Sequence, residues 1–377
     1  MFDTPYRLAF AQVPVSANLL QQLLRAFSDA RAAWHADRAD LAAATERGNA
    51  LADAVLRARA RIIPERLYED VQRAGCHVLA HGDETYPKSL VNISSPPLIL
   101  YGRGDLSLLE RPCVAVVGTR RASTYGQRCA DHFGAAFARA GMVVVSGMAR
   151  GVDAAAHDAA LRCGGGTVAV LGCGVDVCYP PEARRRKAEI EARGLVLSQF
   201  APGTPPLPNH FPSRNRIVSG LSRGVVVIEA GMRSGALITV DHAIEQTRDV
   251  FAVPGSIFGP NSEGSNRIIA EGIATPATSP DAVLEALGMK TLGAPLRGMI
   301  DATASRALRD DGVKAVWRIM REAEAGDEAL EVEEIIRTSG IGSSAVIRAL
   351  TALELEGLLQ RAPGNLYRVH PQALGLC

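Results

Sequence analysis

The 377-residue sequence lacks the features that mark several common classes of protein. It has no run of eighteen apolar residues, and its first ten residues hold no basic segment followed by an apolar core, so we expect neither a membrane span nor a signal peptide. Its seven cysteines are an odd number without a C-x-x-C pair or a neighbouring histidine cluster. This pattern argues against a disulfide framework and a bound metal, and it favours a reducing cytoplasm.

Lysine and unbalanced charge are also scarce. Only four of the 41 basic residues are lysine, and the net charge of +1 creates no overall field for a polyanion. The arginine excess has a simple explanation in a high-GC genome, although arginine is also the better ligand for phosphates and bases. Two nucleotide-binding motifs are missing, because no G-x-x-x-x-G-K-[ST] loop occurs and no G-x-G-x-x-G follows the first predicted strand. We therefore expect no cofactor.

Composition divides the chain into segments with different predicted structures. Residues 1–80 are rich in Ala, Leu and Arg at helical spacing, which predicts a small all-helical module. Residues 81–110 form a connector that is interrupted by prolines and ends in a short apolar strand, and residues 276–304 form a linker. Residues 305–377 predict three helices followed by two strands around a Pro-Gly-Asn turn, which together make a winged-helix domain.

Residues 111–275 predict a doubly wound, mostly parallel α/β sheet of the Rossmann-like type. Short β-branched runs alternate there with helical stretches, a pattern typical of buried parallel strands joined by helices. Ligands of such folds bind beyond the carboxyl ends of the strands. The predicted strands cover residues 113–118, 142–147, 167–172, 194–198, 224–230 and 249–255.

The loop after the first strand combines glycine, hydroxyl and guanidinium groups ahead of a helix. Arg120 and Arg121 offer charge-assisted hydrogen bonds, and the start of a helix binds anions through its free N–H groups. We expect an anion site here in preference to an ordinary surface turn with solvated arginines. The expected ligand residues are Gly118, Thr119, Arg120, Arg121, Ser123 and Gly126.

The loops after the other strands repeat this composition. Asp153 suits the first turn of its helix as a cap, and we expect His157 to be packed or hydrogen-bonded. The basic run Arg184–Lys187 fits a solvated helix face and a phosphate contact equally well. Between residues 111 and 272, Arg and Lys exceed Asp and Glu by 18 to 13, whereas residues 305–370 hold 9 against 11. The further expected binding residues are Ser146, Gly147, Arg150, Gly151, Arg233, Ser234, Gly235 and Asn266.

The segment FPSRNR, residues 211–216, places an aromatic ring beside two guanidinium groups. The prolines before it predict an extended approach and a helix that starts near Ser213, with Arg214 and Arg216 in its first turn. Cations at that end oppose the helix dipole, and a shared anion would remove the conflict. Phe211 is suited to stack on a base, although taken alone it is better explained as a hydrophobic staple on the helix.

Several motifs together resemble the DNA-processing protein A (DprA, or Smf) family. The similar stretches are VAVVGTRRASTYG, VVSGMARGVDAAAH, FPSRNRIVSGLSRGVVVIEA, SGALITVDHAIEQ and FAVPG, in this order within residues 86–275. The strand ends carry Gly, Ser or Thr and Arg with almost no acid, so we expect a site that holds phosphates and no enzyme. The resemblance implies a cytoplasmic protein that forms a homodimer through its Rossmann-like domain. It also implies binding and protection of incoming single-stranded DNA during natural transformation, and loading of the RecA recombinase.

The resemblance also implies roles for single residues. Arg120 becomes a phosphate contact and Phe211 a base-stacking residue. The same basic pocket is lined by Arg214, Asn215 and Arg216. The chain departs from the family at Gln199, where the family usually has an acid. Residues 13–20, VPVSANLL, lack the glycine-containing hairpin of many N-terminal modules, so we expect no DNA binding there.

Two other functions stay open. One is a nucleotide-hydrolysing Rossmann enzyme related to lysine-decarboxylase-like phosphoribohydrolases, for which the chain offers only Glu229 or Asp153 as the acid or base. The other is a winged-helix transcription factor, which is disfavoured because seven acids between Glu322 and Glu334 would repel duplex DNA. We expect the C-terminal domain to contact a protein or to serve regulation.

Overall fold

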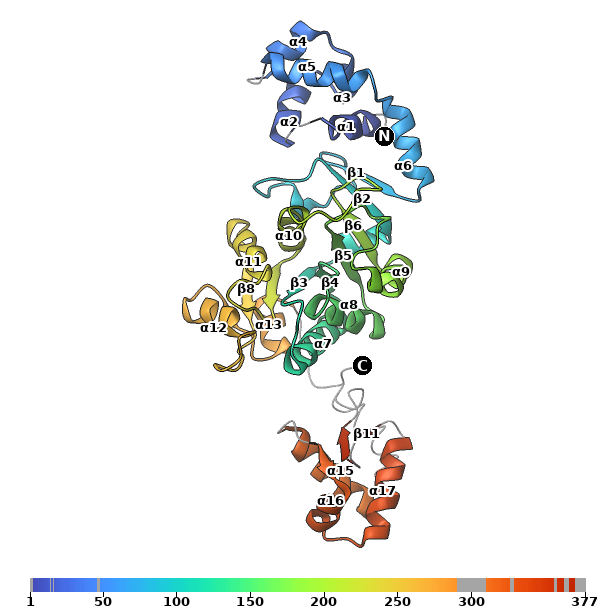
Figure 1. The fold of residues 1–377 in the computed structure, drawn as a ribbon, viewed down its shortest axis with the longest axis vertical. Helices are drawn as coiled ribbons and strands as arrows, with labels where there is room; N and C mark the ends of the chain where they lie inside the picture. The colour runs from blue at the N-terminus through green and yellow to red at the C-terminus, as the bar shows by residue number, and fades with distance from the viewer. Residues whose placement is uncertain are drawn as a thin grey trace. The chain divides into compact units, whose positions relative to one another are not determined.

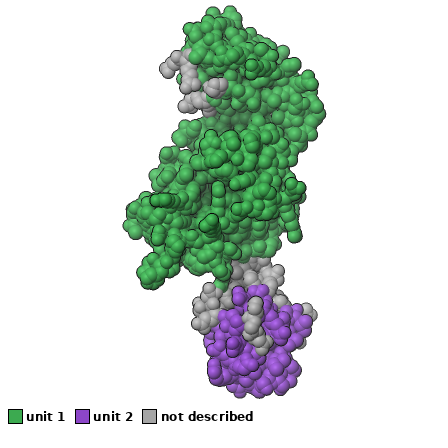
Figure 2. Space-filling view, in the orientation of Figure 1, with its two compact units in different colours: residues 1–288 green, residues 289–377 purple. Residues whose placement is uncertain are grey.

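The computed structural model describes residues 3–13, 15, 17–45, 48–289, 310–325, 329–355, 358–362 and 366–369. The chain divides into two compact units, residues 1–288 and 289–377, which Figure 2 shows in green and purple. The first unit holds the N-terminal helices and a large sheet, and the second holds the C-terminal domain.

The large sheet has nine strands in the order β1-β2-β6-β5-β4-β3-β7-β8-β9. From β6 to β9 every neighbouring pair is parallel, which confirms the predicted doubly wound α/β fold. The parallel part begins at β3, runs outward through β4, β5 and β6, and returns to the other side of β3 with β7. The strand order therefore reverses between β3 and β7, where such folds bind ligands. The parallel strands are β3 (Cys113–Val117), β4 (Val143–Ser146), β5 (Thr167–Leu171), β6 (Leu195–Ser198), β7 (Gly224–Val227), β8 (Asp249–Ala252) and β9 (Thr275–Pro276).

Two antiparallel strands extend the sheet beyond β6. β2 (Ile99–Gly104) pairs with β6, and β1 (His77–Ala80) pairs with β2. β2 is the apolar strand predicted at the end of the connector, whereas composition alone assigns the residues of β1 to the helical module. Four residues, HVLA, are too few to show an alternating pattern directly after a helix. Pairing with β2 decides their conformation.

Helices cover both faces of the parallel strands (Figure 1). On one face, Ile217 and Val218 of α10 and Val240 of α11 join the core formed by the valine-rich strands. On the other face, Leu161 of α8 and Ile190 of α9 pack on the strands, and α7 packs beside α8. The helices that follow β3 are α7 (Thr124–Arg139), α8 (Val152–Arg162), α9 (Arg184–Arg193), α10 (His210–Leu221), α11 (Ala236–Glu245), α12 (Glu263–Ala270) and α13 (Pro280–Ala286).

Helices also form the N-terminal module, as predicted. Its core includes Phe10 and Trp34, whose rings meet edge to face with centroids 5.2 Å apart. Thr4 donates its hydroxyl to Asp83 at 3.0 Å, which ties the module to the segment after β1. The helices are α1 (Thr4–Phe10), α2 (Ala17–Ala26), α3 (Ala30–His35), α4 (Arg38–Ala43), α5 (Gly48–Arg59) and α6 (Pro64–Arg73).

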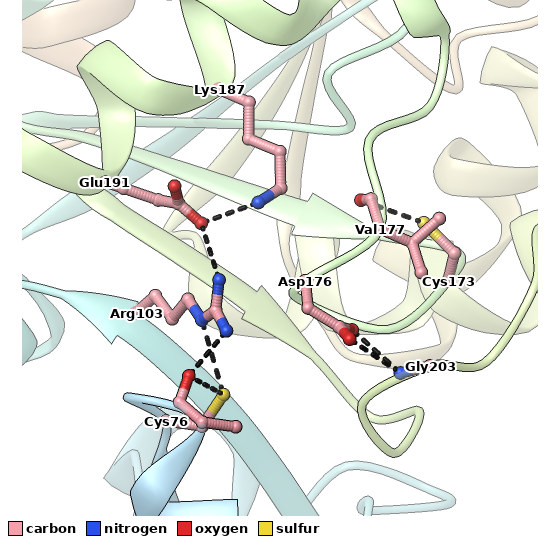
Figure 3. Close-up of polar contacts among 9 residues, drawn as sticks. Cys76, Arg103, Cys173, Asp176, Val177, Lys187, Glu191 and Gly203 are labelled. Carbon is pink, nitrogen blue, oxygen red and sulfur yellow. Dashed lines mark hydrogen bonds and ion pairs between the residues drawn. The ribbon is translucent and has the colours of Figure 1, made fainter.

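A cluster of charged side chains strengthens the junction between this module and the sheet (Figure 3). Arg103 of β2 donates to the Ala74 carbonyl just after α6 at 2.5 Å and to Cys76 Sγ at 3.3 Å. Its guanidinium also lies 3.7 Å from the Glu191 carboxylate on α9, which accepts a hydrogen bond from the buried Lys187 at 2.6 Å. One guanidinium group therefore links α6, the edge of the sheet and α9.

The second unit is a winged helix, as predicted. Its helices are followed by two strands, which join β10 in a sheet of order β10-β12-β11. Gly340 ends the second helix with a φ of 67°, a conformation that favours glycine. The predicted turn at residues 363–365 and residues 290–304 of the predicted linker lie outside the described residues. The first part of that linker forms α13. The elements are α15 (Asp311–Ala325), β10 (Leu330–Glu331), α16 (Val332–Ser339), α17 (Ser343–Leu355), β11 (Leu359–Ala362) and β12 (Leu366–Val369).

The described ranges bear on two expectations drawn from composition. Within them, no helix is long and apolar enough to cross a bilayer. Cys163 is disulfide-bonded, which the scattered cysteines do not predict. The free thiols are Cys76, Cys113, Cys129, Cys173 and Cys178.

Candidate nucleic-acid interface

A pocket of about 710 Å³, which we call the sheet-end pocket, lies at the carboxyl ends of β3, β4 and β7. Its walls come from the loops that follow these strands, from the loops after β5 and β8, and from residues of α10 and α11. This is the place where the strand order reverses and where the sequence predicts a ligand. Of the predicted residues, the pocket brings together Gly118, Thr119, Arg120, Arg121, Gly147, Phe211, Arg214, Asn215, Arg233, Ser234 and Gly235.

The anion loop, residues 118–123, takes its shape from Glu229 just after β7. The Glu229 carbonyl accepts the Thr119 amide at 2.7 Å, and its carboxylate accepts the Ser123 amide at 2.9 Å and the Ser123 hydroxyl at 2.5 Å. The same hydroxyl accepts the Gly126 amide and caps α7. A Cβ at Gly126 would overlap the Glu229 carboxylate, so the position requires glycine. Glu229 is buried with both oxygens bonded, so it positions the loop and is not placed as a free base.

Arg214 lines the pocket, but its guanidinium group is buried and hydrogen-bonded to backbone carbonyls. The side chain is only 4% exposed, and it donates to the Gly147 carbonyl at 2.8 Å and to the Val170 carbonyl. Asp153 accepts the amides of Gly147 and Ala149 at 3.1 and 3.2 Å. A Cβ at Gly147 would lie 2.5 Å from both terminal nitrogens of Arg214, so only glycine allows this packing.

Burial shifts the titration of both charged groups in this cluster. It lowers the pKa of Arg214 to about 10, against the influence of Asp153, so the guanidinium stays charged at neutral pH. Burial raises the pKa of Asp153, against the influence of Arg214 and the two amides. Asp153 lies in the first turn of α8, as predicted, and its carboxylate binds the loop before the helix.

α10 starts at His210, three residues before the predicted start near Ser213. Pro212 falls within the first turn, where a helix needs no N–H group, so this proline does not delay the helix. Arg214 and Arg216 therefore lie beyond the first turn. They do not oppose the helix dipole, contrary to the expectation from the sequence, because that effect fades within one turn.

Arg216 does not line the sheet-end pocket, contrary to the role that the resemblance implies. Its Nε donates to the Ser95 carbonyl at 2.7 Å, and its Nη2 donates to the side-chain oxygen of Gln199 at 2.6 Å. Successive helical residues point in different directions, which separates Arg216 from Arg214. Arg216 thus links α10 to the segments around Ser95 and Gln199.

Phe211 stands between a guanidinium group and a second aromatic ring at one end of the pocket. Arg120 Cζ lies 5.4 Å from the centroid of the Phe211 ring, and the centroid of the Tyr179 ring lies 5.3 Å from it. The backbone of Gly172 supports the ring, because a Cβ there would lie 2.8 Å from Phe211 Cδ1. Sequence reasoning misses Tyr179, since a tyrosine between a cysteine and two prolines forms no recognisable pattern. Both rings and Arg120 line the pocket.

The other predicted residues support the loops from outside the pocket. Arg150 pairs with Glu182 next to a smaller hollow of about 40 Å³. Ser146 is buried and donates its hydroxyl to a carbonyl of β3 at 2.6 Å. Asn266 bonds both the amide and the carbonyl of Gly255 at 3.0 Å, which shapes the loop after β8. The remaining residues of this group are Ser123, Gly126 and Gly151.

Three further sequence features have structural explanations. His157 is buried, with Nδ1 2.7 Å from the Thr167 hydroxyl, as expected of a packed histidine. Within the basic run, Arg186 pairs with Asp158 at 2.6 Å, which supports the helix-face interpretation for that residue. Residues 220–224 have the G-x-S-x-G spacing of hydrolases, but their serine precedes β7 and its buried hydroxyl bonds a carbonyl of α10, whereas the hydrolase motif places the serine after a strand.

Comparisons with known proteins give matches along most of the chain. Residues 77–288 match the family model described as DNA recombination-mediator protein A, and residues 303–365 match the DprA winged helix domain. DNA processing protein DprA of Streptococcus pneumoniae is 46% identical over 203 residues, which cover 54% of this chain and 72% of that protein. An X-ray structure of DprA from that species has a TM-score of 0.66 and 38% identity, covering 75% of this chain and 97% of that chain.

Two further relatives extend the comparison. Protein Smf of Synechocystis is 33% identical, and the match covers 97% of this chain and 98% of that protein. A structure of DNA processing protein A from Helicobacter pylori, described for its single-stranded DNA binding mode, has a TM-score of 0.52 and 30% identity. That match covers 56% of this chain and 95% of the Helicobacter chain.

Proposed function

Because the chain belongs to the DNA recombination-mediator protein A family, we propose that it binds single-stranded DNA in the sheet-end pocket. The observation that carries the proposal is the pairing of Arg120 with Phe211, a guanidinium group and an aromatic ring 5.4 Å apart that face one pocket. A single strand needs these two groups, a cation for its phosphate and a π-face for its base. The single-stranded DNA binding of the Helicobacter relative supports the same ligand.

The charges around the pocket favour phosphate. Arg120, Arg121 and Arg233 are exposed at its walls. Asp153 is the one acid among the lining residues, and it is buried beside Arg214. We infer that phosphates bind Arg120 and Arg233, and that Arg214 adds positive potential from below without direct contact.

The aromatic groups favour single strands over duplex. In a duplex both faces of each base are covered by neighbouring base pairs, so Phe211 and Tyr179 have nothing to stack on. An unpaired strand exposes those faces, and stacking on them accepts any base. We therefore infer binding without sequence preference.

The polar groups favour binding over hydrolysis. The Glu229 carboxylate accepts hydrogen bonds from the anion loop, and the Asp153 carboxylate accepts hydrogen bonds from the loop after β4. An acid or base for cleaving a glycosidic bond has to reach the substrate, and neither carboxylate is free to do so. We propose no catalytic step.

We infer the wider role from the family. A recombination mediator passes single strands to a recombinase, so we propose that this protein acts in the cytoplasm as a homodimer, protects incoming DNA during natural transformation and loads RecA. Co-sedimentation of the protein with RecA, with and without oligonucleotide, tests the partner. Absence of a complex under both conditions would remove this part of the proposal.

Oligonucleotide titration at several salt concentrations tests the binding proposal. We expect a labelled single strand to bind more tightly than a duplex of the same length, with an affinity that falls steeply as salt increases. Arg120→Ala should weaken binding roughly ten- to hundredfold and reduce the salt slope by about one. Arg73→Ala, which removes an exposed arginine from α6, is the control and should bind like the wild type. Equal binding of duplex, or equal slopes for both variants, would contradict the proposal.

A further inference from the structure

The loop after β8, residues 253–262, displays two apolar side chains that the proposed function does not use. Ile257 is 80% exposed and Phe258 is 90% exposed at the tip of this loop. Two adjacent apolar side chains held in water at this exposure are unfavourable for an isolated molecule. Such tips are typical of surfaces that contact a ligand.

The loop holds its tip in a fixed conformation. The Asn266 side chain bonds the amide and the carbonyl of Gly255 at 3.0 Å. Tyr125 of α7 donates its hydroxyl to the Pro254 carbonyl at 2.8 Å. At the tip, Ser256 accepts the Phe258 amide with its hydroxyl at 3.2 Å and the Gly259 amide with its carbonyl at 3.1 Å. The backbone that presents the Phe258 ring is therefore held by hydrogen bonds, which lowers the entropy that a ligand must remove on binding.

The same loop borders the sheet-end pocket. Asn261 lines that pocket and donates its side-chain amide to the Arg121 carbonyl at 2.8 Å. A second cavity of about 540 Å³ lies on this side of the anion loop and is lined by Ser123, Tyr125 and the residues that flank the tip. A strand that leaves the sheet-end pocket past Arg121 consequently reaches this loop next.

We propose that Phe258 is a second base-stacking residue, which receives the nucleotide next to those in the sheet-end pocket. Arg121 binds the phosphate between the two sites, and the stacked base is recognised by its π-face alone. The inference rests on the proposed function, because it extends the path of the same strand. The alternative use of an exposed apolar tip is contact with a second copy of this chain, and the experiment separates the two.

The experiment compares short and long oligothymidylates on the full chain by fluorescence anisotropy. A strand of about four nucleotides fills the sheet-end pocket, and one of about fifteen also passes the tip. We expect Phe258→Ala and Phe258→Leu to weaken binding of the long strand roughly five- to hundredfold and to leave the short strand unaffected. Phe258→Trp should bind normally, and the long strand should quench its added fluorescence. Ile257→Ala is the matched control and should resemble the wild type.

Three results give other answers. Unchanged affinity of Phe258→Ala for the long strand would overturn the inference and leave the proposed function intact. A loss that appears together with a changed sedimentation coefficient, and that a higher protein concentration restores, would assign the tip to contact between copies. Failure of the wild type to bind either strand would instead refute the proposed function.

Discussion

Removing the Arg214 side chain should destabilise the first unit far more than removing that of Arg120. Arg214→Met keeps an unbranched side chain in place of the aliphatic part of arginine and deletes the guanidinium group with its charge. It leaves Asp153 buried without its cation, and it frees the carbonyls of Gly147 and Val170. Arg120→Met makes the same chemical change at an exposed position.

The magnitude follows from the burial of Arg214 at 4% exposure. Leaving the two buried carbonyls without a donor costs about 1–3 kcal/mol each, and the buried Asp153 carboxylate also loses its nearby positive charge, so we expect a total of about 3–5 kcal/mol. A unit of 288 residues has an unfolding entropy near 0.6 kcal/mol/K, so its melting temperature should fall by about 5–8 °C. The exposed Arg120 should change it by roughly 1 °C or less.

Calorimetry and oligonucleotide titration on both variants check this prediction. We expect Arg214→Met to lower the melting temperature while leaving the salt slope of binding close to that of the wild type. Arg120→Met should leave the melting temperature nearly unchanged and reduce the salt slope of binding. If Arg214→Met melted like the wild type and lost binding as Arg120→Met does, Arg214 would be a direct ligand of the DNA and not a buried structural residue.

Three further predictions test the residues around the pocket. Gly147→Ala should destabilise the protein by about 2–4 kcal/mol in denaturant unfolding, because the added Cβ displaces the buried guanidinium group of Arg214. Unchanged stability would show that Arg214 can move aside without losing its hydrogen bonds. Glu229→Gln should weaken oligonucleotide binding roughly three- to tenfold in an anisotropy titration with little loss of stability, because the Ser123 contacts lose their charge assistance; wild-type affinity would argue against a role of Glu229 in shaping the anion loop. Burial lowers the pKa of His157 to about 3, below the value near 6.5 expected for the unfolded chain. The neutral histidine therefore makes its full contribution to the free energy of unfolding above pH 6.5, and this contribution falls as the pH decreases toward 3. When the pH falls from 7 to 5, the free energy of unfolding measured with denaturant should decrease by about 2 kcal/mol because of His157, and His157→Gln should lack this part of the pH dependence.

The sequence predicts the sheet and the place of the pocket because both follow from local patterns. Short valine-rich runs mark buried parallel strands, and loops with glycine and arginine after successive strands must meet at one edge. β1 follows no such pattern, because four residues gain their conformation from pairing with a distant strand. The start of α10 is also missed, since Pro212 suggests a break but fits the first turn of a helix.

The sequence does not separate residues that bind from residues that support. Arg120, Arg214 and Arg216 are equivalent by composition, yet the first is exposed at the pocket wall, the second is buried below it and the third points elsewhere. This difference arises from the helical phase of α10 and from the space left by Gly147. Tyr179 enters the pocket only through the path of the loop after β5, which local sequence does not determine.

Photo-crosslinking identifies the residues that touch the strand, and so it tests whether DNA binds at the ends of the parallel strands. A single-stranded oligonucleotide that carries 5-iododeoxyuridine, which reacts with aromatic side chains in contact with the base, is bound to the full chain and irradiated. Peptide mass spectrometry should then find crosslinks in the peptides that hold Phe211 and Tyr179, and Arg120→Ala should reduce them. Crosslinks confined to the N-terminal helices or to the winged helix would contradict the claim that DNA binds at the ends of the parallel strands.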